Sequence, residues 1–226
     1  MTSRPAATLA QRKRQLVADE LTRAALELLA GGGFDAVTVD EIATAAGVSK
    51  RTFFRYFASK EDVVVRFLGA LGAAMREELA RRPAGEAPSV ALRHAVWRSV
   101  EDCAGHEERA RQVVRLVLST PALLARFLER QAQWRDDLAE ELAARLGLDA
   151  GRELYPRLAA DMALAAFHTV LQRWSADDDA AGGASGGGGG AAVDPAALTG
   201  SCFAVIAPAL DAVVRTPAPG GAPATA

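Results

Sequence analysis

Residues 49–57 carry side chains suited to binding nucleic acid. Arg51 can donate two hydrogen bonds to guanine, Thr52 can contact a thymine methyl group or a phosphate, and Lys50 can reach either. Four of the thirteen aromatic residues in the chain stand within five consecutive positions of the same run. This composition predicts a short helix that presents basic and hydroxyl side chains to DNA.

The aromatic rings of this run explain how such a short helix is held. Phe53 and Phe57 lie four residues apart, so on a helix they share one face and can pack inward. A unit of about sixty residues has a small core, and large rings fill it with few side chains. The run therefore predicts an apolar back and a cationic front.

Capping residues and glycine place this helix second in a pair. Thr38 and Glu41 have the spacing of a capping box at the start of the first helix, and Gly47 ends that helix. Ser49 can cap the second helix, and a longer helix opened by Thr8 precedes both. This is the plan of a helix-turn-helix, whose second helix enters the major groove.

Apolar residues recur three and four apart almost throughout the chain, which predicts an all-α fold. Caps, glycines and prolines divide it into about nine helices. The expected helices cover residues 8–33, 38–46, 49–57, 59–80, 89–105, 107–119, 120–146, 149–176 and 194–215.

The expected organisation is a DNA-binding domain at 1–60, with a basic arm at 1–14, followed by a helical effector-binding and dimerisation domain at 61–215. A flexible glycine-rich loop is expected at 177–193 and a disordered tail at 216–226.

Charge is distributed unevenly around a net value of −2. Residues 1–60 carry nine Lys/Arg and six Asp/Glu, and all three lysines of the chain lie there. A basic front part favours a polyanionic partner. The chain shows neither a long uncharged apolar stretch nor the pattern of a signal peptide, so a cytoplasmic protein without a membrane partner is expected.

The stretch "GFDAVTVDEIATAAGVSKRTFFRYFASKEDVV", residues 33–64, resembles the DNA-binding signature of the TetR family of bacterial transcriptional regulators. The long helical remainder agrees with that family in length and layout. The resemblance implies a homodimeric regulator that binds a palindromic DNA operator and responds to a small-molecule effector. A ligand-responsive repressor is therefore the expected function.

The resemblance also implies which residues touch the operator. In the family, the positions of Thr38 and Lys60 contact phosphates through side chains or adjacent backbone amides. Phe54 stands where tyrosine is usual, so a phosphate hydrogen bond from that ring is missing. Arg51 stands where glycine is frequent, which suggests an additional base or phosphate contact. The expected DNA-binding residues are Thr38, Ser49, Lys50, Arg51, Thr52, Phe54, Arg55, Tyr56 and Lys60.

The resemblance implies that the last two helices form the dimer interface, and we expect the regions of Leu164, Val170, Val205 and Ala209 to lie there. A symmetric pair of subunits would supply two recognition helices for two half-sites. The form of the signature also resembles members that bind acyl-CoA-like or other lipophilic effectors. Candidate pocket residues are Trp97, Val100, Phe127, Gln131, Trp134, Met162, Phe167, His168 and Trp174.

Two alternatives remain open at this stage. A thiol-based redox-sensing regulator would be switched by Cys103 or Cys202, and a helical small-molecule-binding protein would not bind specific DNA. The sequence contains no catalytic motif and no cofactor fingerprint, so no enzyme and no cofactor are expected. Cys103 and His106 lie three apart without a matching third or fourth ligand, so no metal site is expected.

Overall fold

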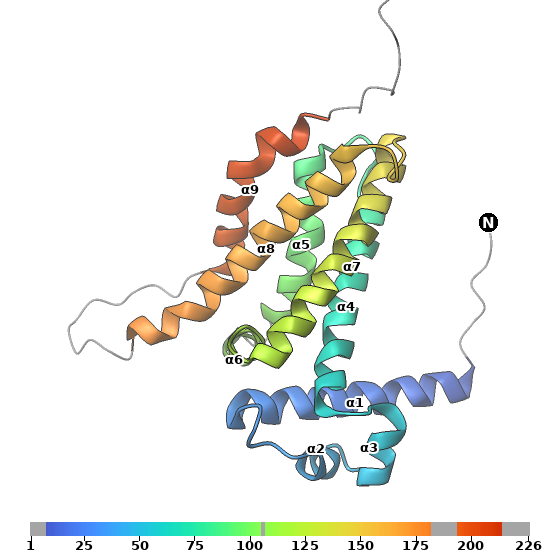
Figure 1. Ribbon diagram of the computed structural model, residues 1–226, viewed down its shortest axis with the longest axis vertical. Coiled ribbons are helices and arrows are strands. Elements are labelled where there is room, and N and C mark those ends of the chain that lie inside the picture. The colour runs from blue at the N-terminus through green and yellow to red at the C-terminus, as the bar shows by residue number, and fades with distance from the viewer. Residues whose placement is uncertain (1–7, 105–106, 182–193, 214–226) are drawn as a thin grey trace, which may run out of the picture. The chain divides into compact units, whose positions relative to one another are not determined.

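The computed structural model describes residues 8–104, 107–181 and 194–213 (Figure 1). Within these residues the secondary structure consists of nine α-helices and no strand, which confirms the all-α prediction. The first half of the expected basic arm, residues 1–7, and the tail expected at 216–226 lie outside the described residues. No helix in the described part of the chain is both long enough and apolar enough to span a membrane.

The described helices belong to two compact units. The first comprises Met1–Ala70 and His106–Leu128, and the second comprises Leu71–Gly105 and Glu129–Ala226. The first unit contains α1 (Leu9–Gly32), α2 (Val39–Ala45), α3 (Lys50–Tyr56), α6 (Glu107–Ser119) and the beginnings of α4 (Lys60–Arg81) and α7 (Pro121–Leu146). The second contains the remainders of α4 and α7 with α5 (Pro88–Ala104), α8 (Leu154–Ala181) and α9 (Pro195–Asp211).

Local caps set where the first helices begin. The Thr8 and Gln11 side chains each accept a hydrogen bond from the other's backbone amide, and Thr38 and Glu41 do the same at the start of α2. Each cap stabilises its helix by on the order of 1 kcal/mol. Both predicted capping boxes are thus confirmed.

The core of the first unit lies on one face of α1. The spacing of apolar residues on this helix predicts a buried stripe of Val17, Leu21, Ala24 and Leu28. Leu21 and Ala24 are buried, whereas Val17 and Leu28 are only half-buried. Leu29 is fully buried instead. The stripe is displaced because α2 and α6 both contact α1, so its buried face is wider than one row of side chains.

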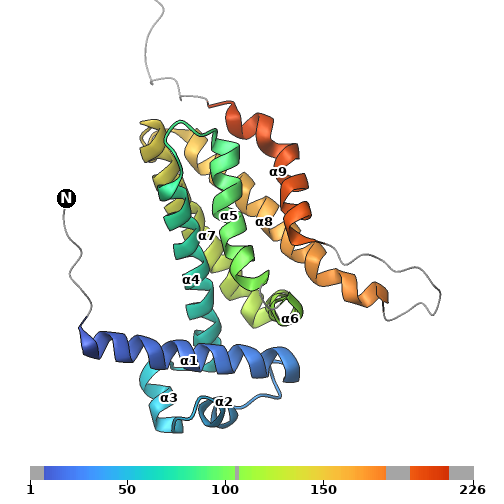
Figure 2. The same cartoon turned by 180° about the vertical axis from the view of Figure 1, so that it is seen from behind.

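In the second unit, α8 and α9 lie side by side and run in opposite directions (Figures 1 and 2), and α9 also packs against α5. The prediction that α8 begins at Asp149 is wrong, because that residue closes a turn. Its carboxylate accepts from the Gly151 amide at 2.8 Å, and its carbonyl accepts from the amide of Glu153 at 2.9 Å. Pro156 falls in the first turn of α8, where its missing amide removes no helical hydrogen bond.

The other end of α8 also differs from expectation. The helix continues to Ala181, so the first five residues of the loop expected at 177–193 are helical. The remainder of that loop, 182–193, lies outside the described residues. The expectation of a flexible loop overlooked that Asp and Ala residues can extend an existing helix, which needs no new nucleus.

One face of α9 is buried against the rest of the second unit. The buried residues are Pro195, Thr199, Phe203 and Leu210, whereas Val205 is 80% exposed. Nearly every residue of α9 is apolar or small, so periodicity alone could not select one face. Phe203 decides the orientation because it is the largest side chain that the helix can bury.

The carboxyl end of α9 is fastened to two other helices. Asp211 accepts hydrogen bonds from the Ser89 amide at 2.9 Å and the Ser89 hydroxyl at 2.8 Å, which also caps α5. The Tyr155 hydroxyl donates to the Leu210 carbonyl from the first turn of α8. Burial, and secondarily the charge of Asp211, raises the pKa of Tyr155 from its ordinary 10.0 to about 12.

This pKa predicts a loss of stability in alkali. Because the pKa is higher in the folded chain, the stabilising effect of neutral Tyr155 is complete below about pH 10 and disappears as the pH rises through about 12. The expected loss is on the order of 2 kcal/mol in the free energy of unfolding. Urea unfolding across this pH range measures it.

The Tyr155→Phe variant is the matched control for this titration. It keeps the buried ring and removes the titrating hydroxyl, so its stability should fall less steeply over the same pH range. Parallel declines in both proteins would show that other groups cause the alkaline unfolding.

Candidate nucleic-acid interface

The turn between α2 and α3 fixes the angle between the two helices (Figure 1). Gly47 has a φ of 65°, a left-handed conformation that costs other residues more. The Val48 amide then donates to the Ala43 carbonyl at 2.9 Å, which closes the end of α2. The predicted helix-turn-helix is therefore present, with α3 as its second helix.

Phenyl rings hold α3 from behind. Phe53 is 0% exposed and Phe57 is 6% exposed, as their spacing predicts, and their ring centroids lie 5.7 Å apart. Phe54 is 50% exposed, and its ring meets the edge of Phe53 at 5.5 Å between centroids. The rings of Phe53 and Phe57 therefore anchor the helix, whereas Phe54 adds an apolar surface beside its polar front.

The front of α3 offers two guanidinium groups. Arg51 and Arg55 are both exposed, and neither forms an ion pair with any residue that the structure describes. Arg55 stacks on the neighbouring Tyr56, with its guanidinium carbon 5.3 Å from the ring centroid. Exposed cations without carboxylate partners are suited to binding bases or phosphates.

Other polar groups of the turn are already engaged. Ser49 caps α3, since its hydroxyl accepts from the Thr52 amide at 3.1 Å and lies 3.0 Å from the Thr52 hydroxyl. Lys50 donates to Asp40 at 2.8 Å, and both side chains are more than half exposed. An exposed pair of this kind contributes at most about 1 kcal/mol, so Lys50 can exchange Asp40 for a phosphate at little cost.

Thr38 and Lys60 also have protein partners. The Thr38 amide and hydroxyl both donate to the Glu41 carboxylate, and these bonds lower the pKa of Glu41. The Lys60 ammonium donates to the carbonyls of Phe34 and Val37, and it lies 4.3 Å from the centroid of the Phe34 ring. In this structure Lys60 therefore fastens the start of α4 to the loop between α1 and α2.

Sequence reasoning did not foresee two of these arrangements. The partner of Lys50 is Asp40, ten residues earlier and on the other helix of the pair. Arg14, which was assigned to a basic arm, belongs to α1, and its guanidinium carbon lies 5.9 Å from the Tyr56 ring centroid. Only the packing of α1 beside α3 could reveal that contact.

The candidate pocket residues occupy both units. Phe127 is buried in the first unit, and the other eight lie in the second. Val100, Trp134, Phe167 and Trp174 are buried there, whereas the more polar or flexible candidates are half-buried: Trp97, Gln131, Met162 and His168. Burial lowers the pKa of His168 and favours its neutral form.

Trp134 is the best defined of these candidates. Its indole crosses Phe167 edge-on, with 6.2 Å between the ring centroids. It also lies against Gly72 of α4, because a Cβ there would be 2.0 Å from two indole atoms. One turn earlier on α7, the Gln131 Nε2 is buried and has no hydrogen-bond partner among the described residues.

The described residues contain no group of three or more His, Cys, Asp or Glu side chains able to hold a metal ion. Cys202 is a free thiol of intermediate exposure on α9. The side chain of Cys103 and the whole of His106 lie outside the described part of the chain.

Comparisons with known proteins agree with this geometry. Residues 21–67 match the family described as bacterial regulatory proteins, tetR family, and residues 86–183 match the MftR C-terminal domain. The HTH-type transcriptional regulator TcmR of Streptomyces glaucescens is 39% identical over 174 residues, covering 74% of this chain and 76% of the relative.

Solved structures show the same fold. Thermus thermophilus FadR, a TetR family transcriptional repressor in complex with lauroyl-CoA, is 28% identical with a TM-score of 0.54, and the match covers 90% of this chain and 100% of that chain. FadR from Bacillus subtilis, in complex with stearoyl-CoA, is 22% identical with a TM-score of 0.60, covering 84% and 97%.

The carbonyl contacts of Lys60 predict a role in stability. Lys60→Met keeps the aliphatic stem and removes the ammonium, so two carbonyls lose a charged donor. The free energy of unfolding should fall by about 1.5–3 kcal/mol, measured by urea denaturation without DNA. An unchanged free energy of unfolding would contradict this role and leave Lys60 available for phosphate.

Proposed function

Because this chain belongs to the TetR family and is a DNA-binding transcriptional regulator, we propose that it is a ligand-responsive repressor that binds a palindromic operator as a homodimer. The observation that carries the DNA-reading part is the front of α3. Arg51 and Arg55 are exposed there without carboxylate partners, on a helix whose back is held by Phe53. Rigid presentation of cations at one helix face suits a major groove.

We assign base contacts and phosphate contacts to different residues of α3. Arg51 stands in the first turn of α3 and is the residue that we assign to a base edge, preferentially guanine. Lys50, Thr52 and Arg55 flank it and contact phosphates or neighbouring bases. Phe54 supplies exposed apolar surface that fits a thymine methyl group.

The exposed apolar surface of the second unit supports the dimer. Its exposed large apolar residues, among those described, all lie on or directly after the last two helices: Leu154, Leu158, Val205 and Val213. Ala209 is exposed on the same helix as Val205. Leu164 and Val170 are buried within their own subunit, so the interface that we propose uses the opposite face of α8. A twofold pairing of α8 and α9 would cover this surface.

The interior of the second unit supports a lipophilic effector. Trp134, Phe167 and Gly72 form an apolar wall, and the buried Gln131 Nε2 is a donor that an effector carbonyl could satisfy. The two FadR structures contain lauroyl-CoA and stearoyl-CoA. In each of these molecules a long acyl chain is joined to coenzyme A through a thioester carbonyl. We therefore infer an acyl-CoA or a similar lipophilic molecule as effector.

The mechanism by which the operator is released depends on α4, which directly follows the recognition helix in the chain. α4 begins three residues after Phe57, which caps the carboxyl end of α3, and it contributes residues to both units. An effector that binds one orientation of α4 more tightly shifts the population toward that orientation. The spacing of two recognition helices in a dimer then changes, and the operator is released.

Selection of bound sequences from random duplex DNA tests the DNA-binding proposal. The wild-type protein should enrich an inverted repeat whose half-sites are about one helical turn, roughly 34 Å, apart. Arg51→Ala should weaken binding to the selected sequence by about 1–3 kcal/mol and leave binding to random duplex nearly unchanged. Direct titration of both duplexes measures the difference.

Two outcomes would count against this assignment. Equal losses on selected and random DNA would show that Arg51 contacts phosphate rather than a base. Enrichment of a single asymmetric site would contradict the symmetric dimer.

Lauroyl-CoA tests the effector proposal. All three tryptophans, Trp97, Trp134 and Trp174, lie in the second unit, so tryptophan fluorescence excited selectively over tyrosine reports on that unit alone. Lauroyl-CoA should change the fluorescence and release the selected DNA over the same concentration range, and coenzyme A without an acyl chain should do neither. DNA release without any fluorescence change would place the effector elsewhere.

A further inference from the structure

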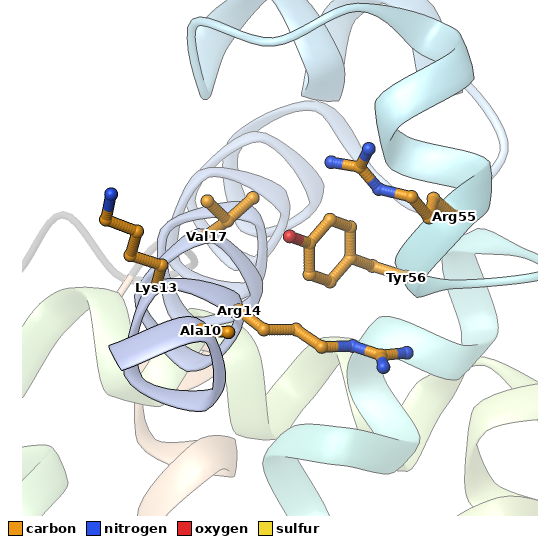
Figure 3. A pocket seen from close by; sticks show the side chains of 6 residues that line it. All are labelled: Ala10, Lys13, Arg14, Val17, Arg55 and Tyr56. Atoms are coloured by element: carbon orange, nitrogen blue, oxygen red, sulfur yellow. The ribbon is translucent and has the colours of Figure 1, made fainter. Parts of the chain in front are cut away.

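A hollow of about 430 Å³ separates the beginning of α1 from the end of α3 (Figure 3). It lies within the first unit. Of the residues that line it, only Arg55 and Tyr56 are among the DNA-binding residues expected from the sequence. The residues that α1 contributes are spaced as one helical face. The lining consists of Ala10, Lys13, Arg14, Val17, Arg55 and Tyr56.

The charged side chains that line this hollow are all cationic. Lys13, Arg14 and Arg55 are exposed, and none of them forms an ion pair with a residue that the structure describes. In Figure 3 the Tyr56 ring lies between Arg14 and Arg55, whose guanidinium carbons are 5.9 Å and 5.3 Å from the ring centroid. Both guanidinium groups therefore lie within the range of cation–π contacts with the same ring.

The Tyr56 hydroxyl is directed toward α1 in Figure 3, and no protein group in the described residues accepts its proton. A phenol held in this way is a hydrogen-bond donor with a defined direction. Three cations and one donor around a hollow, with no carboxylate in its lining, are suited to binding an anion.

A second hollow of about 290 Å³ lies beside the first and shares Arg14 and Tyr56 with it. Its additional cation, Arg66, is paired with Asp19 at 2.7 Å. Because that carboxylate offsets the charge of Arg66, the second hollow is less favourable for an anion. The unbalanced positive charge is therefore concentrated on the side of Lys13 and Arg55.

We propose that Lys13 and Arg14 of α1, with Tyr56 and Arg55 of α3, bind phosphates of the DNA backbone beside the groove that α3 enters. This site rests on the proposed DNA-binding function and extends it to α1. The phosphates would fix the register of the protein on the duplex without reading its sequence.

The exposure of the site favours DNA over a small anion. Ion pairs of exposed cations contribute little in water, so a free phosphate would gain little from Lys13 and Arg14. A duplex gains more, because each neutralised phosphate releases condensed counterions. Arg55 and Tyr56 also belong to α3, so an occupied groove brings the flanking phosphates to this hollow.

Salt-dependent binding to a random-sequence duplex tests the site. Each cation that contacts a phosphate contributes about 0.9 to the slope of log K against log salt. Arg14→Gln should lower the slope by about 1 per bound subunit, and Lys13→Gln with Arg14→Gln by about 2. At about 0.1 M salt, each lost contact should weaken binding roughly five- to tenfold.

Two matched variants separate this site from general electrostatics. Arg93→Gln removes an exposed arginine of α5 in the second unit and should leave the slope at its wild-type value. Tyr56→Phe should weaken binding roughly tenfold with an unchanged slope, because it removes a hydrogen bond to a charged group and no charge. Unchanged melting temperatures establish that the variants are folded.

Two kinds of result would contradict the proposal, and they can be told apart. Wild-type slopes in the Lys13 and Arg14 variants, or an equal loss of slope in Arg93→Gln, would overturn the α1 site while leaving the regulator intact. A wild-type chain that binds neither random nor selected duplex would overturn the proposed function and the α1 site together.

Discussion

The burial of Phe53 is the constraint on which the surface proposed to bind DNA depends. α3 has only seven residues, and a helix so short is unstable in isolation. Full burial of one phenyl ring stabilises a structure by about 1.5–3 kcal/mol, which is comparable to the total that local caps can supply. The orientation of Arg51 and Arg55 is thus set by what lies behind the helix rather than by interactions in front of it.

The cations of the first unit divide into two kinds. The first kind has protein partners. The Lys60 ammonium donates hydrogen bonds to two loop carbonyls, and Lys50 pairs with the exposed carboxylate of Asp40 at 2.8 Å. Arg51 and Arg55 of α3 and Arg14 of α1 form no ion pair with a residue that the structure describes. Net charge therefore understates the attraction for DNA, because what matters is which positive charges remain unneutralised at one surface.

In the second unit, one face of α9 is held by hydrogen bonds and packing, and the opposite face is exposed. Asp211 and Tyr155 hold the end of α9 against α5 and α8, so the helix is fixed within its own subunit. Its opposite face still exposes Val205. In the proposed dimer, an interface built on a helix that is already fixed would require less ordering on association, which would lower the entropic cost of pairing.

Helix positions were largely decided by local sequence, because caps, glycines and prolines act over one turn of chain. The boxes at Thr8 and Thr38 and the left-handed Gly47 are of this kind. Tertiary packing alone decided where the Lys60 ammonium points, which face of α9 is buried, and that Arg14 meets Tyr56. Those features join residues far apart in the chain or select among equally apolar faces, and neither periodicity nor spacing carries that information.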